Sequence, residues 1–382
     1  MRKLLTIQRF LGLTLLVHLL LSLPVRAQTT EGFPAEKIAR IDQAVKAFMS
    51  RLNVPGLSVG VVSDDQLRWQ QGYGLSDVEN SVPVKAGTVY RLASASKPIT
   101  ATAVMQLVER GKIDLDAPVQ KYIPAFPKKA YPVTVRDLLN HTSGIRHYKG
   151  EEEDSTRYYG SLTEALSIFK DDPLEHPPGS KFTYSTYGYT LLGAIVEAAS
   201  GLTFTDYLRE NIFKPAGMSQ SRSDSVRDII PNRARGYVKR DKGKLSNAGL
   251  VDTSYKIPGG GLVSTVEDMA KFVIAVQNGT LVKKATFAQM SISQVNQEVW
   301  ERTRVEQKVP KDKASQGYGF GWIIGTERRK EAIWHGGVQS GATTLIYLLP
   351  KKRLAIVVMM NLEGEAAELE RFGDELADTI LQ

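Results

Sequence analysis

The chain has 382 residues, of which 42% are hydrophobic and 24% are charged, and its formal net charge is +8. This is an ordinary globular composition, and the length allows one large domain or two smaller ones. Because the sequence contains no cysteine, a catalytic thiol, a disulfide framework and a cysteine-ligated zinc site are all excluded.

The chain opens with a predicted secretory signal peptide over residues 1–27. Arg2 and Lys3 precede the apolar run 10–23, and Val25-Arg26-Ala27 fits a small-residue cleavage site. The run is short for a membrane span, although an uncleaved anchor is the alternative. The lysines and arginines of this segment account for half of the net charge, so the charge is poor evidence for nucleic-acid binding. We therefore expect an exported protein, periplasmic or secreted, with no nucleic-acid partner and no integral membrane span after cleavage.

An amphipathic helix is predicted over residues 35–52, where apolar side chains recur at helical spacing. Residues 56–63 and 66–73 follow as two strands, separated by the turn Asp64-Asp65. Two short strands joined by a tight turn predict a β-hairpin.

The first of these strands contains Gly56-Leu57-Ser58-Val59-Gly60, which matches the G-x-S-x-G nucleophile elbow of α/β-hydrolases. An elbow requires a sharp strand-to-helix turn that exposes the serine. Here a second strand follows instead of a helix, so we interpret Ser58 as a small residue within a strand. A hydrolase with a parallel sheet and Ser58 as nucleophile is kept as an alternative.

The middle of the chain, roughly residues 91–314, is predicted to consist mainly of helices and loops. Two charged segments, 149–157 and 298–313, are expected to be solvated surface loops, with partner binding as the alternative.

A second hairpin is predicted near the C-terminus, from strands at 343–349 and 354–361, and a helix is expected over 365–381. Hairpins at both ends favour an antiparallel sheet, because parallel strands need long crossover connections.

The predicted fold is therefore α+β, with a single domain over residues 28–382. Residues 28–90 and 315–382 would form the sheet platform with its flanking helices, and residues 91–314 a mostly helical part.

A second candidate nucleophile lies in the S-x-x-K motif Ser94-Ala95-Ser96-Lys97, although Ser167-Ile168-Phe169-Lys170 matches the same pattern. Context separates the two, because apolar residues at helical spacing follow Lys97 and Pro98 suits the first turn of a helix. Ser94 is therefore predicted at a helix N-terminus, where free N–H groups favour developing negative charge. Lys97 lies one turn further on, and it can activate a serine only if burial or nearby cations keep it neutral.

Three stretches in this order, "SASK" at 94–97, "YST" at 184–186 and "HGG" at 335–337, resemble the motifs of the serine β-lactamase and penicillin-binding-protein family. The class C β-lactamases and their esterase and peptidase relatives look similar. Further stretches resemble family patterns: 138–144, 187–197, 258–272 and 318–322. The combination of "GIRHY" at 144–148, "YSTYGYTLL" at 184–192 and "NRARGYV" at 232–238 looks closest to the mitochondrial serine β-lactamase-like branch and its bacterial relatives. The resemblance covers nearly all of the chain after residue 27.

The resemblance implies a role for each matching residue. Ser94 would be the acylated nucleophile, and Lys97 and Tyr184 would share its activation and the protonation of the leaving group. The backbone N–H groups of Ser94 and Val338 would form the oxyanion hole. Removing one such donor typically costs about 3–4 kcal/mol of transition-state stabilisation.

The substrate-binding residues implied by the resemblance are Thr186, His335, Gly336 and Gly337. The two glycines would let the substrate backbone approach an edge strand closely. Thr186 stands where many β-lactamases carry asparagine. An asparagine side chain can both donate to and accept from a substrate amide, whereas threonine offers only a hydroxyl. His335 stands where the family has lysine, and an ordinary histidine is mostly neutral at pH 7. Both departures predict weak or no β-lactamase activity.

We therefore predict an exported serine hydrolase that forms a Ser94 acyl-enzyme on an ester or amide, with a peptide as one option. Its partner would be a small-molecule or peptide substrate. No metal and no cofactor are expected, because no two histidines form an H-x-x-x-H pair. The alternatives are a true β-lactamase or a D-amino-peptidase of the same family, and a catalytically silent binding or scaffolding protein. The sequence provides no prediction of the oligomeric state.

Overall fold

The computed structural model describes residues 32–241, 243–310 and 315–382. The predicted signal peptide, residues 1–27, lies outside these ranges. Among the helices that the ranges contain, none has the length and apolar character needed to cross a membrane.

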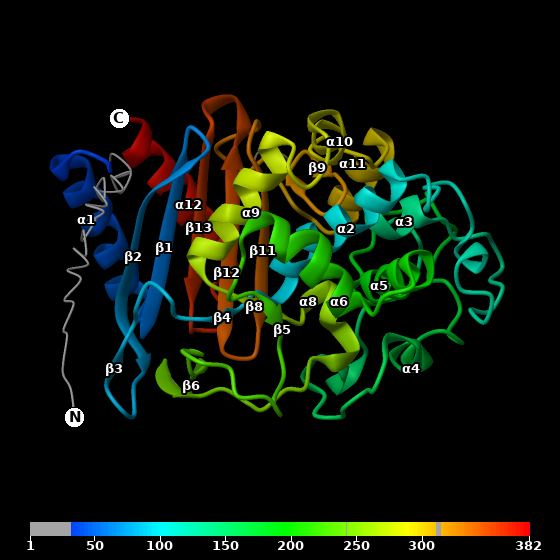
Figure 1. Cartoon of the computed structure of the whole chain (residues 1–382), viewed down its shortest axis with the longest axis horizontal. Coiled ribbons are helices and arrows are strands. Elements are labelled where there is room, and N and C mark those ends of the chain that lie inside the picture. Colours follow the sequence, from blue (N-terminus) through cyan, green and yellow to red (C-terminus); the bar gives the residue numbers. More distant parts are fainter. Residues whose placement is uncertain (1–31, 242, 311–314) are drawn as a thin grey trace, which may run out of the picture.

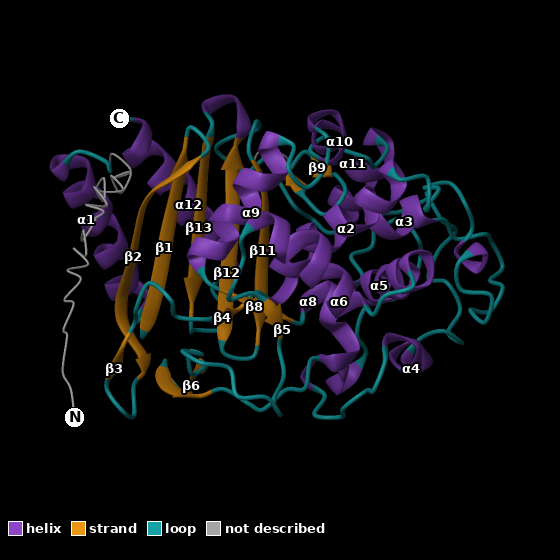
Figure 2. Cartoon of the chain, viewed as in Figure 1, coloured by secondary structure: helices purple, strands orange, loops and turns teal. Residues whose placement is uncertain are grey.

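An eight-stranded antiparallel sheet forms one half of the molecule (Figures 1 and 2), as predicted from the hairpins at the two chain ends. Its order, β3-β2-β1-β13-β12-β11-β10-β9, places the first strands of the chain beside the last. In the β1–β13 pair, for example, Val59 lies opposite Val358. The strands are β1 (Gly56–Ser63), β2 (Gln66–Asp77), β3 (Val82–Pro83), β9 (Gly317–Tyr318), β10 (Ile323–Ile324), β11 (Ile333–Gln339), β12 (Ala342–Leu349) and β13 (Leu354–Met360).

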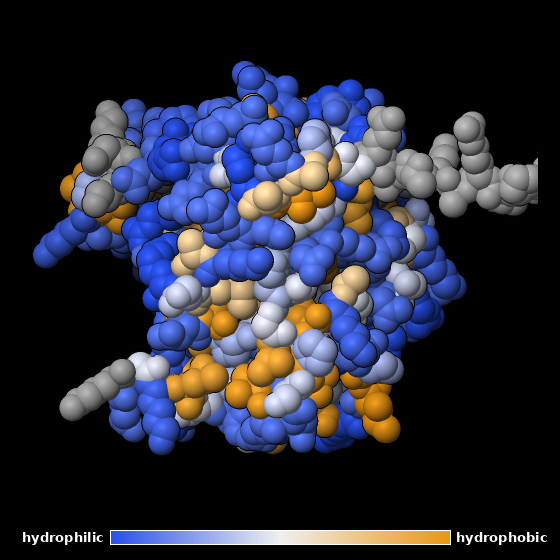
Figure 3. Space-filling view, turned by 90° about the vertical axis from the view of Figure 1, so that its left-hand side faces the viewer, coloured by the Kyte–Doolittle hydropathy of each residue, from blue (hydrophilic) through white to orange (hydrophobic). Residues whose placement is uncertain are grey.

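Helices α1 (Ala35–Leu52) and α12 (Ala366–Leu381) from opposite chain ends lie together on one face of the sheet (Figure 1). Their apolar faces are buried, and the rings of Phe48 and Phe372 stack with centroids 4.2 Å apart. Viewed from the side of these helices, the surface is mostly hydrophilic, with apolar residues gathered in its lower half (Figure 3).

The other face of the sheet packs against the helical part of the chain. Helix α2 (Lys97–Glu109) runs through its centre, and every residue from Lys97 to Leu107 is buried, as expected for a helix enclosed on all sides. The remaining helices are α3 (Val135–Leu139), α4 (Leu162–Ala165), α5 (Thr186–Ser200), α6 (Phe204–Leu208), α7 (Lys214–Ala216), α8 (Ile257–Gly260), α9 (Val266–Asn278), α10 (Lys284–Met290) and α11 (Gln297–Glu306). Short strands form two small sheets: β4 (Tyr90–Arg91), β8 (Leu262–Ser264) and β5 (Arg222–Ser223), and β6 (Tyr237–Arg240) with β7 (Lys244–Asn247).

The described parts of the two charged segments lie largely at the surface, as predicted, but they contain helices rather than loops alone. Residues 297–306 form helix α11 rather than a loop, because Val299 and Thr303 supply a buried stripe beneath the charged side chains. Residues 150–154 form a short 3₁₀ helix whose Glu152 pairs with the buried Arg146 at 2.6 Å. This second segment is therefore anchored to the helical part.

Candidate active site

Ser94 lies in the 3₁₀ helix η1 (Ala93–Ser96), which leads from β4 directly into α2. Its side chain is partly exposed, whereas Ala93, Ala95 and Ser96 around it are buried. The preceding residue, Ala93, has a φ of 48°, a left-handed conformation that non-glycine residues rarely adopt and that is often found at functional sites. The predicted helix start is therefore confirmed, with a 3₁₀ turn in place of the first α-helical turn.

Strand β11 approaches η1 at Gly337. A Cβ at this position would lie 2.2 Å from the carbonyl oxygen of Leu92 and 2.8 Å from the backbone nitrogen of Ser94. No side chain fits into this space, so glycine is required for the contact. Val338 follows Gly337 on β11, so the two predicted oxyanion donors belong to two backbone segments in direct contact.

Lys97 is fully buried at the start of α2. Its Nζ lies 3.1 Å from the Oγ of Ser94, 3.3 Å from the Oγ1 of Thr186 and 2.6 Å from the carbonyl oxygen of Gly259. Burial, followed by the nearby cation of Lys256, lowers the pKa of Lys97 well below its ordinary value. A neutral amine has two N–H donors and one lone pair, so it can donate to Thr186 and Gly259 and accept the proton of Ser94.

Lys256 is a second buried lysine beside the site, and the motifs did not reveal it. Its Nζ donates to the carbonyl oxygen of Glu153 at 2.8 Å and lies 5.3 Å from the ring centroids of Tyr148 and Tyr255. Burial lowers the pKa of Lys256 to about 8, with Glu153 acting in the opposite direction. The sequence signal was its position just before Pro258-Gly259-Gly260, the turn whose carbonyl binds Lys97.

Tyr184 is a second polar side chain that contacts the nucleophile. Burial raises the pKa of the Tyr184 phenol above its ordinary value, and a hydrogen bond with Ser94 acts against this shift. The Nζ of Lys97 lies 4.7 Å from the centroid of the Tyr184 ring. Tyr184 is therefore a neutral phenol at pH 7 that can donate a proton, while Lys97 is the group suited to accept one.

Thr186 is buried at the first residue of α5, where it serves as a partner of Lys97. Two histidines hold the backbone of this turn: the N–H of Ser185 donates to His141 at 3.1 Å and the N–H of Thr186 donates to His147 at 3.3 Å. Burial lowers the pKa of His147 to about 4, with Lys97 as the next cause, so it stays neutral at pH 7. These neutral histidines hold the backbone of the "YST" stretch, residues 184–186, in place and carry no charge.

His335 is buried between two partners. Its Nε2 lies 3.0 Å from the hydroxyl of Tyr318 and its Nδ1 lies 2.6 Å from the carbonyl oxygen of Gly336. Since Nδ1 must donate to the carbonyl, Nε2 accepts from the tyrosine hydroxyl. Burial, with Lys97 as the next cause, lowers the pKa of His335 to about 3, so the ring is neutral at pH 7. It supplies no cation to a substrate.

The structure thus brings Ser94, Lys97, Tyr184 and Thr186 together and places Gly337 against them. Gly336 has room for a side chain, because a methyl group added there would lie 3.4 Å from its nearest neighbour, so packing does not require a glycine. Ser58 lies elsewhere, on β1, buried with its Oγ 3.1 Å from the hydroxyl of Tyr90. Its surroundings match the interpretation as a strand residue.

Comparisons with known proteins give a consistent result. The family model described as Beta-lactamase matches residues 41–378. The mitochondrial serine beta-lactamase-like protein LACTB of Homo sapiens is 38% identical over an alignment of 297 residues, and the match covers 60% of this chain and 54% of that protein. Protein flp of Staphylococcus aureus (strain N315) is 26% identical over 334 residues, covering 85% of this chain and 63% of the relative. The chain therefore spans between 54% and 63% of the length of these relatives.

Solved structures share the fold. The octameric penicillin-binding protein homologue from Pyrococcus abyssi has a TM-score of 0.75 at 28% identity, covering 89% of this chain and 77% of that chain. The penicillin-binding protein from Bacillus halodurans has a TM-score of 0.72 at 26% identity, covering 87% and 98%. The D-amino acid amidase from Ochrobactrum anthropi SV3 has a TM-score of 0.76 at 22% identity, covering 91% and 99%, and supports the fold alone.

Proposed function

The chain belongs to the Beta-lactamase family of serine hydrolases, as its three ordered motifs indicated, and on this premise we propose that it hydrolyses an ester or amide through an acyl-enzyme on Ser94. One observation carries the proposal: the buried Nζ of Lys97 lies 3.1 Å from the Oγ of Ser94. Because the chain spans only part of its curated relatives, their activities are not transferred to it.

Acylation begins when the Oγ of Ser94 attacks the carbonyl carbon of the substrate and Lys97 takes the hydroxyl proton. The negative charge that develops on the carbonyl oxygen is bound by the N–H groups of Ser94 and Val338. Such preorganised donors act where charge forms, and they are often the largest single catalytic contribution.

Tyr184 then donates its phenolic proton to the leaving alcohol or amine as the tetrahedral intermediate collapses, and the proton held by Lys97 restores the phenol. The acyl-enzyme is an ester of Ser94. Water hydrolyses this ester with the same groups in reverse order: Tyr184 takes a proton from the attacking water as it passes its own phenolic proton to Lys97, and Lys97 then returns that proton to the Oγ of Ser94 as the ester bond breaks.

Two features favour a substrate other than a β-lactam. His335 is neutral at pH 7 and engaged with Tyr318, so it offers no positive charge to a β-lactam carboxylate. Thr186 is buried and bound to Lys97, so it offers no amide to the substrate. We therefore propose weak or no β-lactamase activity. Two solved proteins that share the fold are a D-amino acid amidase and EstCE1, a hydrolase with promiscuous acyltransferase activity, and their likeness concerns the fold alone.

The proposal includes export by the signal peptide at residues 1–27 and a single catalytic domain over residues 28–382. A true β-lactamase, a D-amino-peptidase of the same family and a catalytically silent scaffold are the alternative functions.

A fluorophosphonate probe tests the nucleophile. Wild type is expected to be labelled at one serine, Ser94→Ala is expected to lose labelling, and Ser58→Ala, the matched control, is expected to keep it. Equal labelling of wild type and Ser94→Ala would show that Ser94 is not the nucleophile. Loss of labelling in Ser58→Ala alone would support Ser58 as the nucleophile of a G-x-S-x-G elbow. Absence of labelling in wild type would favour the silent scaffold.

Substrate class is tested by intact-mass detection of the acyl-enzyme across an ester, a D-amide and a cephalosporin. We expect turnover with the ester or amide and slow turnover of the cephalosporin. A median enzyme turns over about 10 times per second, and a cephalosporin rate in that range would show a true β-lactamase.

A further inference from the structure

A cavity of about 300 Å³ lies beside the reaction centre, with Tyr184 in its wall. It passes from the helical part, along the short strands β9 and β10, to helix α12. Aromatic and aliphatic side chains form most of the wall, among them Phe182, Tyr184, Trp300, Tyr318, Ile323 and Trp334. The polar lining residues include the carboxyl group of Glu370.

Two tryptophans leave accessible aromatic surface in the wall of this cavity. The indole N–H groups of Trp300 and Trp334 donate to the backbone carbonyls of Ser315 and Gly325, both at 3.0 Å, so their polar atoms are already paired. Trp300 and Trp334 remain partly exposed. Such rings attract a cation through their electron-rich faces.

Glu370 is the charged group in the wall that lacks a partner among the described residues. It is partly buried, and it makes no hydrogen bond and no ion pair with the residues that the structure describes. Arg304 also lines the cavity, but its guanidinium is bonded to Glu301 and to the carbonyl of Val309. The cavity therefore offers a carboxyl group and no free cation among its described lining residues.

Burial and the neighbouring charges make Glu370 an unusually weak acid. Burial, then the carboxylates of Asp374 on α12 and Glu327 in the loop before β11, raise the pKa of Glu370 to about 7, and Arg371 acts in the opposite direction. A cation placed in the cavity would relieve this repulsion.

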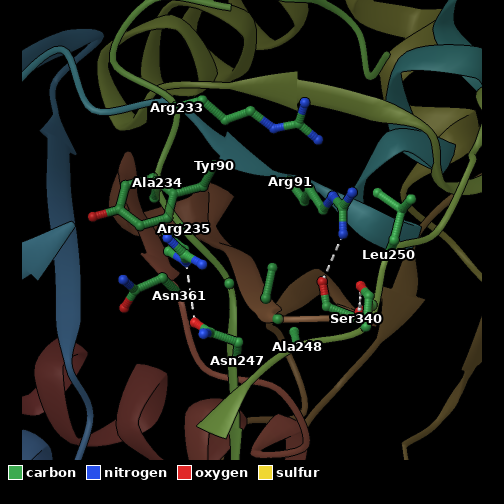
Figure 4. Close-up of a pocket in the computed structure, with 14 residues that line it drawn as sticks. Tyr90, Arg91, Arg233, Ala234, Arg235, Asn247, Ala248, Leu250, Ser340 and Asn361 are labelled. Carbon is green, nitrogen blue, oxygen red and sulfur yellow. Dashed lines mark hydrogen bonds between the residues drawn. The ribbon is translucent and has the colours of Figure 1, made fainter. Parts of the chain in front are cut away.

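A second cavity, of about 360 Å³, differs in this respect (Figure 4). Arg91 and Arg233 both pair with Asp224, and Arg235 pairs with Glu79. Because each guanidinium there has a carboxylate partner, the described lining of that cavity shows no unpaired charged group for a ligand.

We infer that the aromatic cavity between Tyr184 and Glu370 binds an apolar arm of the substrate that ends in an ammonium group. The arm lies against the rings, and its ammonium group pairs with the Glu370 carboxylate. This inference rests on the proposed function, because Tyr184 both lines the cavity and bonds to Ser94, so the arm extends from the bond that Ser94 attacks.

Direct binding tests the cavity without catalysis. The fluorescence of Trp300 and Trp334 is titrated with 3-phenylpropylamine and with the neutral 3-phenylpropanol, in the full chain carrying Ser94→Ala. We expect the amine to bind at least about tenfold more tightly than the alcohol, as for one charged hydrogen bond. Glu370→Gln should abolish this preference, and Glu375→Gln, an exposed acid-to-amide change on the same helix, should retain it.

Equal binding of amine and alcohol, or an amine preference that survives in Glu370→Gln, would overturn the inference. The preference should also rise between about pH 6 and about pH 8, because Glu370 ionises there while the amine stays charged. A preference that is flat over this range would contradict the role of Glu370.

Kinetics link the cavity to the reaction. With wild type, an ester bearing the phenylpropylammonium arm should have a KM about tenfold lower than its neutral analogue, and Glu370→Gln should raise that KM without changing kcat. Loss of fluorophosphonate labelling concerns only the proposed function, since amine binding in Ser94→Ala is measured independently. Equal KM values for the two esters would overturn the inference even if Ser94 is the nucleophile.

Discussion

Lys97 and Lys256 show how surroundings determine what a side chain can do. Both are buried, both have a pKa below the ordinary lysine value, and each has a partner carbonyl. Only Lys97 contacts Ser94. Lys256 acts on Lys97 through its charge, which disfavours a second cation nearby.

Replacing Lys256 tests this effect. In Lys256→Met the cation is absent, so the pKa of Lys97 rises and a smaller fraction of it is neutral at a given pH. The acid limb of the kcat/KM profile on an ester should move to higher pH by up to about one unit. The measurement is the pH profile below about pH 8, where Lys256 of the wild type is charged.

Lys256→Arg provides the control, because it keeps the cation and should leave the limb close to its wild-type position. Thermal melts of both variants verify that they fold. An unchanged limb in a folded Lys256→Met would show that burial alone lowers the pKa of Lys97.

At the scale of elements, the site depends on the contact between strand β11 and the turn η1. Gly337 allows the strand to touch the backbone at Leu92 and Ser94. A side chain added at the neighbouring Gly336 would lie on the other face of the strand, where a methyl group fits.

Gly337→Ala should therefore damage catalysis strongly. The new methyl would push β11 away from Ser94, and a displacement of about 1 Å at a catalytic site can cost about a hundredfold in rate. The measurement is the rate of fluorophosphonate labelling.

Gly336→Ala serves as the folding control for this experiment, and its melting temperature should stay close to that of the wild type. Wild-type labelling in Gly337→Ala would show that the strand contact does not position the nucleophile.

At the scale of the whole molecule, the two ends of the chain form one unit. Strand β1 lies between β2 and β13, and α1 stacks on α12 through Phe48 and Phe372. The helical part is inserted between these ends and packs on the opposite face of the same sheet. Sheet residues such as Ile346 and Val357 belong to the same buried cluster as helix α2, so the core of the helical part is incomplete without the sheet.

We therefore expect a single unfolding transition. Phe48→Ala removes a buried ring far from the site and should destabilise the protein by about 3–5 kcal/mol. Because the parts share one sheet, the active site should be lost at the same, lower temperature as the sheet. Calorimetry and residual probe labelling after heating measure the two events.

Two separated calorimetric peaks, or labelling that survives loss of the sheet, would contradict the single domain proposed for residues 28–382. Leu381→Ala, an exposed apolar change on α12, is the matched control and should leave the transition near its wild-type temperature.

The sequence alone determined the features that depend on local pattern. Helical and alternating spacing predicted α1, β1, β12, β13 and α12, and the helix start at Ser94 followed from Pro98 and the apolar residues after it. The pairing of the chain ends followed from hairpin geometry. The loop prediction was wrong for residues 297–306, because the charged residues there hide the narrow buried stripe of α11.

Only the tertiary structure decided the protonation states and the shape of the site. Lys256 and Lys97 are far apart in sequence, and their coupling arises because separate segments bury both amines together. His335 is neutral because the fold encloses it beside Tyr318, and Glu370 lacks a partner among the described residues because α12 places it in an aromatic cavity. Local spacing specifies which backbone forms, whereas burial and neighbouring charge depend on contacts between distant segments, and those contacts determine the chemistry.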